Sequence, residues 1–548
     1  MAIHHKLLVP TRINIPQLLA ALGYDQRYIN DHQDKYHYIL HKILEQRIFD
    51  SSIEAEGYSP LHLDTLRTFL GRRYADAILN ELVVLDIVQC DFIKLYGEKG
   101  QKAYGYRINP ALASKASLQP VSKKVFDKKL RDAAYRYKQK WSKTILWKNL
   151  TQLGIRDKEA YAFIDAKLET SRMMLLEYER ALTQVIDRNN TAQVRDVYRE
   201  VYNSYSAKED RFKAKHTTSS SSFPSSSVYS LIPVQLIEKE LQLKSNQGIT
   251  LRNYLESLLL NKYNADEQSI RLIAENGYFI EQPDLTSRVF TNLSNLSGEL
   301  RQFLFHKRLP GTLVNLDIRN SQPYLLSLLL ADQYAGHSLP ATVANYINLT
   351  AEGKFYERMM ELVGMNPDAI TKRSRKEFKK TFFAKIFFCS THYSRRTPEG
   401  KAFRQHFREV ADIIDAYKGK AHEQLAITMQ RREASIILKV IGSELQKRGI
   451  WFATIHDSVV VMPEHEEQVK ELVRVSFKNA VGVAPTVESE YLSADVNPVR
   501  AKGLADAVLL KQSEVLLNEA VREDTIDLHT LASLVNDIST SWNNFFDD

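Results

Sequence analysis

The sequence predicts an α+β multidomain protein. Its 548 residues are enough for about two to four domains of ordinary size. Hydrophobic residues make up 44% and charged residues 26%, a globular composition that excludes a fibrous repeat or a fully disordered chain. Residues 119–215 show helical periodicity, whereas residues 231–505 mix helical stretches with short β-rich runs. We therefore expect several units, and the largest core in the last of them.

The first unit, residues 1–118, contains the element order of a winged helix between about residues 59 and 110. PLHLDTLRTFL predicts a helix, Gly71 interrupts it, and RRYADAILNELVVLDIV predicts a second helix. Two β-prone runs, DFIKLYG and KAYGYRIN, then flank turn residues and would form the wing. Such a module lays its second helix in the major groove, so we expect four cations to contact nucleic acid: Arg72, Arg73, Lys99 and Lys102. A winged helix that binds another protein is the alternative.

Composition defines three further segments. Residues 119–215 are rich in Lys, Arg, Glu, Ala, Leu and Tyr at helical spacing, which predicts a helical arm. Residues 216–230 are Ser-rich and of low complexity, which is typical of a linker. Residues 506–548 are acidic and amphipathic, and we expect a helical tail there.

Charge and cysteine content narrow the partners and the compartment. The net charge of +8 and the pI of about 9.0 favour a polyanionic partner. Only two cysteines occur, Cys90 and Cys389, which argues against a zinc cluster or a disulfide framework. No apolar run is long enough for a signal peptide core or a membrane span. We expect a cytoplasmic protein that does not bind membranes.

Two segments place a carboxylate where a strand ends. In GTLVNLDIRNSQPYLLSLLL, a β-prone run ends at Asp317 and a helix begins near Ser321. In GIWFATIHDSVVVM, two β-prone runs meet at His456 and Asp457, so a hairpin carries a carboxylate at its tip. Taken singly, such residues are more often caps, turn residues or packed histidines.

A third segment lies between these two in the chain. In KRSRKEFKKTFFAKIFF, cations and aromatics recur at every fourth position and so share one face of a predicted helix: Arg375, Lys379, Phe383 and Phe387. Arg and Lys can bind a triphosphate while Phe stacks on a planar base. A basic solvated face beside an aromatic core face would show the same pattern.

In their order along the chain, these three segments resemble motifs A, B and C of the family A DNA polymerases and of the related phage-type single-subunit RNA polymerases. The resemblance covers roughly residues 284–465, and the IHDS sequence of motif C is its closest match. It implies a right-hand body over residues 231–505, with thumb-like helices. The palm would span about residues 284–340 and 431–500, and the fingers about residues 341–430.

The resemblance also implies roles for individual residues. Asp317, Asp457 and the backbone carbonyl of Ile318 would hold two Mg²⁺ ions, for which Mn²⁺ could substitute. Lys379 would contact the nucleoside triphosphate with help from Arg375, and Phe383 would stack on the incoming base. Four further residues would contact primer-template nucleic acid: Arg288, Arg301, Gln430 and His456.

Two departures from the family leave sugar selection open. Gln322 stands where family A DNA polymerases carry the Glu that excludes the ribose 2′-hydroxyl, and Tyr324 is a second group able to fill that space. Phe387 stands at the motif B Tyr, and Phe388 follows it in place of Gly. No upstream segment shows the spaced acids of a proofreading exonuclease.

We therefore expect a DNA polymerase without proofreading that extends primer-template DNA. A single-subunit RNA polymerase or primase is the alternative within this class, and RNA is then a possible nucleic-acid partner. A non-catalytic DNA-binding replication initiator is the alternative from a different class. The nucleotide set that extends a primed template would separate these three readings.

Overall fold

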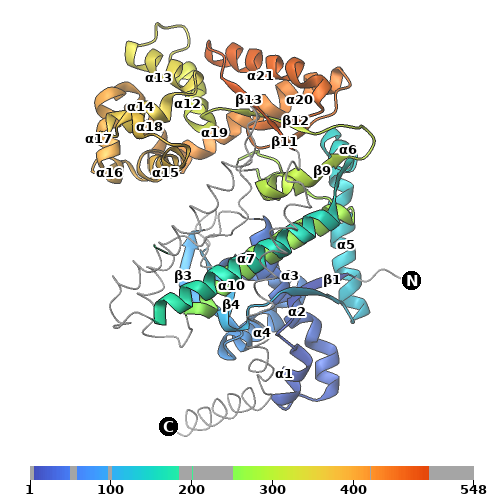
Figure 1. Ribbon diagram of the computed structural model, residues 1–548. Helices are drawn as coiled ribbons and strands as arrows, with labels where there is room; N and C mark the ends of the chain where they lie inside the picture. Colours follow the sequence, from blue (N-terminus) through green and yellow to red (C-terminus); the bar gives the residue numbers. More distant parts are fainter. Residues whose placement is uncertain are drawn as a thin grey trace.

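The computed structural model has an upper part with helices and a small sheet, and a lower part built from the N-terminal residues (Figure 1). It describes residues 5–49, 58–96, 102–183, 200, 251–284, 286–419, 421 and 423–492. The predicted linker, residues 216–230, and the predicted tail, residues 506–548, lie outside the described residues.

The N-terminal module forms around a long helix, α2 (Gln26–Phe49). Strand β1 (Lys6–Pro10) pairs antiparallel with β5 (Ala116–Pro120), so the two ends of this module are joined by a sheet. Helix α1 (Ile15–Ala21) follows Asn14, whose side chain accepts a hydrogen bond from a backbone N–H of the first turn. The β1–β5 pair was not predicted, because the sequence of β5, ASLQP, shows no apolar alternation.

The helices and strands predicted between residues 59 and 110 are present. They are α3 (Leu63–Leu70), α4 (Arg72–Val84), β3 (Val88–Tyr96) and β4 (Lys102–Ile108). Gly71 separates the two helices with a φ of 88°, a backbone conformation that favours glycine. A further strand, β2 (Ser59–Leu61), completes an antiparallel sheet of order β2-β4-β3. The described elements follow one another as two helices and a two-stranded antiparallel pair, whereas the winged-helix identity of the module and its binding of nucleic acid stay predictions.

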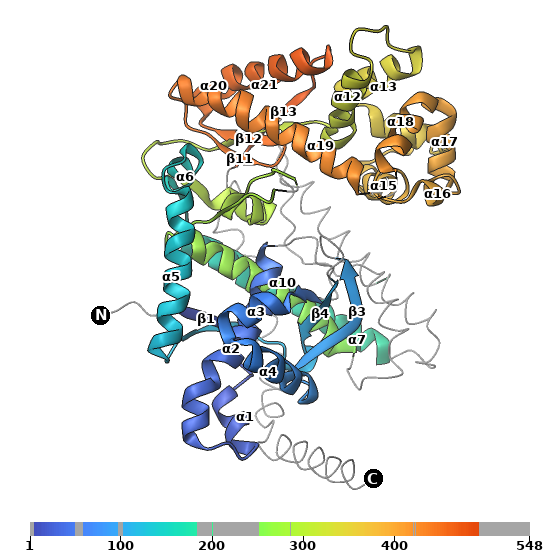
Figure 2. The same cartoon turned by 180° about the vertical axis from the view of Figure 1, so that it is seen from behind.

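Helices connect this module to the upper part. They are α5 (Lys124–Trp141), α6 (Ile145–Leu150), α7 (Asp157–Thr183) and α10 (Leu251–Ala274). Helices α7 and α10 pack side by side across the middle of the molecule (Figure 1). Helix α5 runs along one side, from the N-terminal module to α6 (Figure 2). Within the described residues, the segment predicted as a helical arm is mainly helical.

Short elements lead from α10 to the upper sheet. They are β7 (Ile280–Glu281), β8 (Phe290–Thr291), α11 (Asn292–Asn295), η3 (Gly298–Phe303) and β9 (Leu304–His306). Strand β9 pairs with β6 (Leu153–Ile155), which ties this connection to the segment between α6 and α7.

The upper part contains an antiparallel sheet of order β11-β12-β10-β13. Its strands are β11 (Ala453–Ile455), β12 (Ser458–Val461), β10 (Val314–Ile318) and β13 (Val487–Tyr491). Side chains alternate along β10, so Val314, Leu316 and Ile318 enter the largest core on one face of the sheet. The strand turns Asn315 and Asp317 to the opposite face. There, Ala453, Ile455 and Val460 belong to a second core, shared with α6, α7 and α10.

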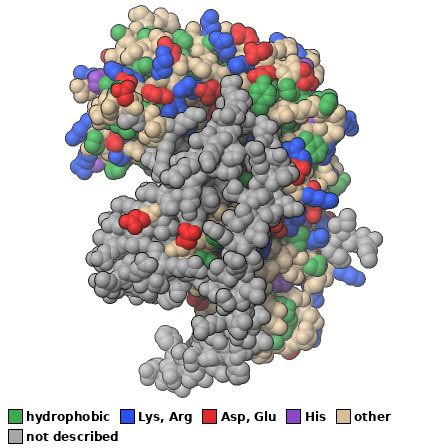
Figure 3. Space-filling model, viewed as in Figure 1, with side chains coloured by type: hydrophobic (Ala, Val, Ile, Leu, Met, Phe, Trp, Pro, Cys, Tyr) green, Lys and Arg blue, Asp and Glu red, His purple; other side chains and the backbone are tan. Residues whose placement is uncertain are grey.

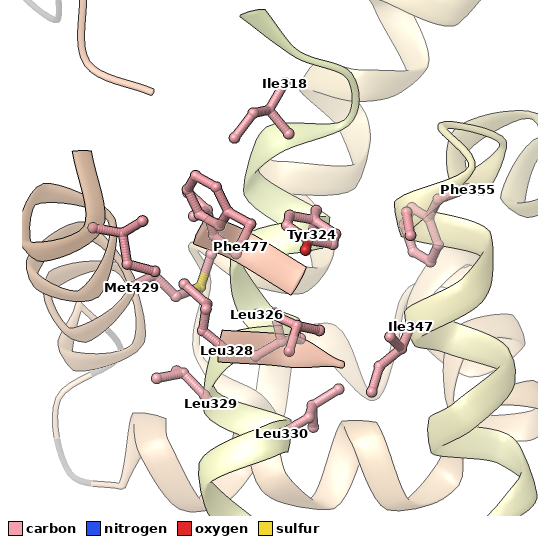
Figure 4. Close-up of a cluster of buried hydrophobic side chains, with 14 of the residues drawn as sticks. Ile318, Tyr324, Leu326, Leu328, Leu329, Leu330, Ile347, Phe355, Met429 and Phe477 are labelled. Carbon is pink, nitrogen blue, oxygen red and sulfur yellow. The ribbon is translucent and has the colours of Figure 1, made fainter. Parts of the chain in front are cut away.

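The largest core is organised by α12 (Ser321–Gln333). Figure 4 shows its residues Tyr324, Leu326 and Leu328 among Met429 and Phe477, which come from α19 (Gln424–Ala434) and α21 (Glu466–Val481). A short helix, α20 (Gly442–Lys447), precedes β11. Because α12 is apolar and buried on nearly every side, its sequence shows no polar face that would orient it.

Helices alone form the lobe from residue 341 to residue 418. They are α13 (Ala341–Ala351), α14 (Phe355–Leu362), α15 (Lys372–Phe382), α16 (Thr391–Ser394), α17 (Pro398–His406) and α18 (Arg408–Lys418). Its interior is largely aromatic, with edge-to-face contacts such as that of Phe355 with Phe382 at a centroid distance of 5.2 Å. This lobe packs beside α12 and α19, and it belongs to the same core.

The structure also bears on the two cysteines and on membrane crossing. Neither Cys90 nor Cys389 forms a disulfide bond with another described residue. Among the described helices, none combines the length and the apolarity that crossing a membrane requires.

Candidate active site

Asp317 and Asp457 lie at the same end of the four-stranded sheet. Asp317 is near the end of β10, and Asp457 lies in the tight turn between β11 and β12. Strand β10 pairs with β12 through Leu316 and Val459. One position further along this register, Asp317 comes opposite Ser458, the residue after Asp457. The sheet therefore brings together two carboxylates that are far apart in the sequence.

The pKa of Asp317 reports the charge around it. Loss of hydration and then the negative charge of Asp457 raise the pKa of Asp317 to about 7, and the cation Lys379 opposes this rise. Glu490 and Glu488, both on β13, add to the negative potential. Asp317 nevertheless keeps exposed surface, so protein crowds the carboxylate without closing it off from solvent. The end of the sheet is an accessible concentration of negative charge that a bound cation would stabilise.

The donor set at this end suits a hard divalent cation. Mg²⁺ binds through one or two carboxylates and keeps water or phosphate oxygens as its other ligands, so Asp317 and Asp457 are sufficient. In the described part of the chain, no group of three or more His, Cys, Asp or Glu side chains could hold a metal. Ile318 buries its side chain in the core (Figure 4), so only its backbone carbonyl could serve as a ligand.

His456 occupies the turn beside Asp457 with a left-handed backbone, at a φ of 52°. Its ring meets Phe290 edge-on at a centroid distance of 5.3 Å, and its buried Nδ1 has no hydrogen-bond partner among the described residues. Burial and the positive charges of Arg288 and Arg301 lower the pKa of His456, although Asp457 opposes them. The lowered pKa favours the neutral ring, and contact of His456 with nucleic acid stays a prediction.

Arg288 forms an ion pair with Glu433 next to this turn. Nε of Arg288 donates to Oε1 of Glu433 at 3.0 Å, and Nη2 donates to Oε2. Glu433 has no exposed surface, and loss of hydration together with the charge of Asp457 raises its pKa to about 7. This pair was not predicted, because its members are 145 positions apart in the chain. Arg288 thus lies near the carboxylates, with its guanidinium engaged by protein.

Arg375 on α15 is held by three neighbours. Its Nη2 donates to Oδ1 of Asn320 at 2.7 Å, and its Nε lies 2.7 Å from Oε1 of Glu357. Its guanidinium carbon lies 5.6 Å from the centre of the Tyr356 ring. Asn320 precedes α12 and follows the strand that carries Asp317. A hydrogen bond therefore links the helix of Arg375 to the end of that strand.

Helix α15 continues into a π-helix, η5 (Phe383–Phe387), and this changes which aromatic side chains share a face with Lys379. The N–H of Phe388 donates to the carbonyl of Phe383 at 2.8 Å, five residues back. Phe387 has no exposed surface, whereas Phe388 is 40% exposed and stacks on Phe383. The expectation that Phe387 binds the nucleotide is therefore wrong, because the spacing of four assumed a regular α-helix. Phe388 takes its place on the exposed face.

Gln322 and Tyr324 were both expected to select the sugar, but they lie in different environments. Tyr324 has no exposed surface, its hydroxyl donates to the carbonyl of Val483 at 2.8 Å, and its ring meets Phe477 at 5.9 Å. Burial raises the pKa of this hydroxyl far above its usual value. Tyr324 is a core residue, and the expectation that it lies beneath the sugar is wrong. Gln322 is half-buried and stays the candidate.

Arg301 and Gln430 differ in how closely they approach the carboxylates. Burial lowers the pKa of Arg301, while the charges of Glu490 and Asp317 act in the opposite direction, so Arg301 lies close to both. Its buried Nε has no hydrogen-bond partner within the described residues. Gln430 is half-buried on α19, three positions before Glu433.

The predicted cations of the N-terminal module are only partly described. Arg72 and Arg73 begin α4 and are exposed. Lys99 lies outside the described residues, and Lys102 begins β4 without a described side chain. A single positive surface formed by all four therefore stays a prediction.

A basic hollow on the helical lobe was missed by the sequence reasoning. It measures about 450 Å³ and has the following lining: Arg395, Lys401, Arg404, Gln405, Arg408 and Asp412. Arg395 and Arg404 both donate to Asp415, at 3.0 Å and 2.7 Å. Figure 3 shows Lys and Arg side chains along the outer edge of this lobe. Its four cations all lie between residues 395 and 408, where Arg395 follows α16, Lys401 and Arg404 are on α17, and Arg408 begins α18.

Comparisons with known proteins give likenesses among solved structures but not among sequences. No family model matches the chain, and no curated protein matches it. Among solved structures, the chain is similar to the POL domain of Pol1 from M. smegmatis, which was solved in complex with DNA primer-template and dNTP. The TM-score is 0.41 at 13% sequence identity, and the match covers 67% of this chain and 72% of that chain. At these values the likeness assigns neither a family nor an activity.

Proposed function

We propose that the protein is a template-directed nucleotidyltransferase, and specifically a DNA polymerase with a family A-like active site. The observation that carries this proposal is the pairing of Asp317 with Asp457 at one end of the sheet. The two carboxylates act on each other electrostatically, and Lys379 acts on Asp317 from the neighbouring helix. A site that concentrates negative charge beside exposed cations suits the binding of metal ions together with a triphosphate.

In this proposal, Asp317, Asp457 and the Ile318 carbonyl hold two Mg²⁺ ions. Bound there, the ions would stabilise charge on the transferred phosphoryl group and lower the pKa of the attacking hydroxyl. The side chains of the protein supply position and electrostatic stabilisation. Lys379 is exposed and Arg375 is half-buried on the same helix, so both can contact the triphosphate while Phe383 stacks on its base.

The nucleic-acid partner would approach from the side of the sheet that carries Asp317. Arg288, Arg301 and His456 lie at this end, as their effects on one another's charge indicate. Because Glu433 already pairs with Arg288, we propose that Arg288 acts on nucleic acid mainly through position and not as a free cation. Gln430, on the same helix as Glu433, would contact the primer.

Primer extension tests the proposal directly. Purified protein is given a primed DNA template with dNTPs or with rNTPs, in Mg²⁺, Mn²⁺ or EDTA. Extension with dNTPs that needs the metal and is lost in Asp457→Asn is the expected result. Asp368→Asn, which changes an exposed carboxylate on the helical lobe, serves as the matched control and should leave extension intact.

Other outcomes would replace the proposal. Extension with rNTPs alone would favour an RNA polymerase, and synthesis on an unprimed template would favour a primase. Binding to DNA without synthesis from either nucleotide set would favour a non-catalytic initiator. We also propose that proofreading is absent, so a 3′-mismatched primer should keep its length when no nucleotides are added.

A further inference from the structure

Two phenylalanine rings stack at the end of the helix that carries Lys379. The ring centroids of Phe383 and Phe388 lie 5.2 Å apart, with an angle of 27° between the ring planes. Phe388 is 40% exposed, whereas the adjoining Phe382 and Phe387 are fully buried. Within this aromatic run, one ring of the stack is therefore open to solvent.

The backbone holds Phe388 in this exposed position. The π-helix η5 ends with the hydrogen bond from Phe388 N–H to Phe383 C=O, and Phe387 is fixed in the core against Phe382 at a centroid distance of 4.9 Å. In a regular α-helix, Phe387 would follow Phe383 on one face and Phe388 would turn away from it. The π-turn therefore leaves Phe387 buried and brings Phe388 to the exposed position beside Phe383.

We propose that Phe383 and Phe388 form a two-ring platform on which a nucleobase stacks, with Phe388 making the outer contact. This inference rests on the proposed function, because it takes the triphosphate to bind Lys379 and Arg375. Nζ of Lys379 lies 5.9 Å from the centre of the Phe383 ring. Cations and platform follow each other along one helix, in the order in which a nucleotide presents its phosphates and its base.

The chemistry of the platform explains why it would accept different bases. Every nucleobase has a π-face, so stacking on an aromatic ring does not depend on sequence. Covering the exposed face of Phe388 would also remove apolar surface from water. The base would come either from the incoming nucleoside triphosphate or from the template strand, and the test uses one probe for each source.

Fluorescence of 2-aminopurine, which stacking quenches, provides the readout. One probe is 2-aminopurine deoxyribonucleoside triphosphate, and the other is a primed template with 2-aminopurine at the templating position. Phe388→Ala should weaken binding of one of these probes by roughly 5- to 150-fold and should reduce its quenching. Phe388→Tyr keeps an aromatic face and should restore both, whereas Phe388→Leu keeps apolar volume and should not.

Tyr393→Ala is the matched control. Tyr393 is also an exposed aromatic residue, at 51%, and it lies on the next helix, α16, outside the platform. Its replacement should leave both probes bound as tightly as in the wild type. Thermal melting verifies that each variant is folded. Because both rings are exposed, we expect their replacement to cost little stability.

Two results would overturn the platform. One is unchanged binding and quenching of both probes in Phe388→Ala, and the other is tighter binding, which would mean that Phe388 only covers Phe383 in the free protein. Primer extension with the same proteins separates this inference from the proposed function. If the wild type extends the primer and Phe388→Ala binds and quenches both probes as the wild type does, the platform is refuted and the polymerase proposal stands. Quenching that depends on Phe388 without any extension would keep the platform and refute the polymerase.

Discussion

Nε of Arg375 lies 2.7 Å from Oε1 of Glu357, so a residue proposed to bind the triphosphate is paired with a carboxylate in the free protein. Glu357 also accepts from Nη2 of Arg319 at 3.4 Å, and Nη1 of Arg319 lies 3.3 Å from Glu488 on β13. Alternating charges therefore run from α15 to the strand beside Asp317. A triphosphate that binds Arg375 has to compete with Glu357.

We predict that Glu357→Gln lowers the KM for the nucleoside triphosphate by about two- to fivefold and leaves kcat unchanged. Gln removes the competing charge but keeps an oxygen that can accept from Arg375, and partly exposed ion pairs are worth about this much. Glu361→Gln is the control, because Glu361 pairs with Arg358 on the same helix, α14. A raised KM would mean instead that the charge of Glu357 positions Arg375.

Asp457→Asn should reduce nucleotide incorporation by on the order of a thousandfold or more, because it removes a negative charge that would hold the metal ions. Affinity for primer-template should change little, since contacts to the phosphate backbone supply most of it. Single-turnover extension and a filter-binding titration measure the two effects. Synthesis at a substantial fraction of the wild-type rate would remove Asp457 from the catalytic site.

The pKa of Asp317, about 7 against an ordinary value of 3.8, predicts how pH controls metal binding. A carboxyl group with a raised pKa favours folding at low pH, and this contribution is lost as the pH rises through 7. Above pH 7 the charged site gains from a cation. Mg²⁺ should therefore bind about tenfold more weakly at pH 6 than at pH 8, where protons no longer compete for Asp317.

Thermal melting with increasing Mg²⁺ at both pH values measures this difference. The Mg²⁺-dependent rise in Tm should be larger at pH 8 and should nearly disappear in Asp457→Asn. The pKa of Glu433 is also raised, to about 7, so its titration would add to the pH dependence of Tm. The variant Glu433→Gln removes that contribution. A Tm shift that is equal at both pH values would show that Asp317 does not bind the metal.

The buried pair of Arg288 and Glu433 predicts a large stability effect. Glu433→Ala should lower the free energy of unfolding by about 3–5 kcal/mol, because it leaves the Arg288 charge unpaired at a mostly buried position. The double variant Arg288→Met/Glu433→Leu should lose less than the single variant. Urea unfolding gives both values, with Glu444→Ala, in the partly exposed Arg448 pair, as the control. Equal losses in the single and double variants would contradict an interaction between the two residues.

The N-terminal module can be tested through Arg72 and Arg73. Replacing both by Ala should weaken binding to duplex DNA and lower the slope of log affinity against log salt by about two, because each phosphate contact releases about one counterion. Lys158→Ala, an exposed cation on α7, should leave the slope unchanged. If the double variant keeps both the wild-type affinity and the slope, the module binds a protein partner instead.

The carboxylates were predictable from the sequence because their signals are local. Asp317 ends an apolar β-prone run, and Asp457 lies between two such runs, so each could be placed on its element without knowing the rest of the fold. Tyr324 was misplaced because α12 is apolar all round, and its sequence does not show which side faces the site. Phe387 was misplaced because helical periodicity of 3.6 residues does not hold through a π-turn.

Other features of the site depend on contacts between distant segments. Glu433 follows two arginines on α19, a context that suggests a solvent-exposed charge, yet Arg288 from an earlier segment buries it completely. Glu357 likewise looks like an ordinary helix-surface residue until α14 and α15 pack together. Such pairs are set by tertiary structure, and one sequence read alone does not contain them.

The π-helix over Phe383–Phe387 has a consequence for comparing this chain with others. A π-turn uses one more residue than an α-turn, so a relative with a regular helix would match this chain only if its alignment opened a one-residue gap there. Without the gap, Phe387 would fall in the column whose place in space belongs to Phe388. A second π-helix, η6 (Ser435–Ile441), precedes Asp457 in the chain, so an alignment with a regular helix would need another gap there.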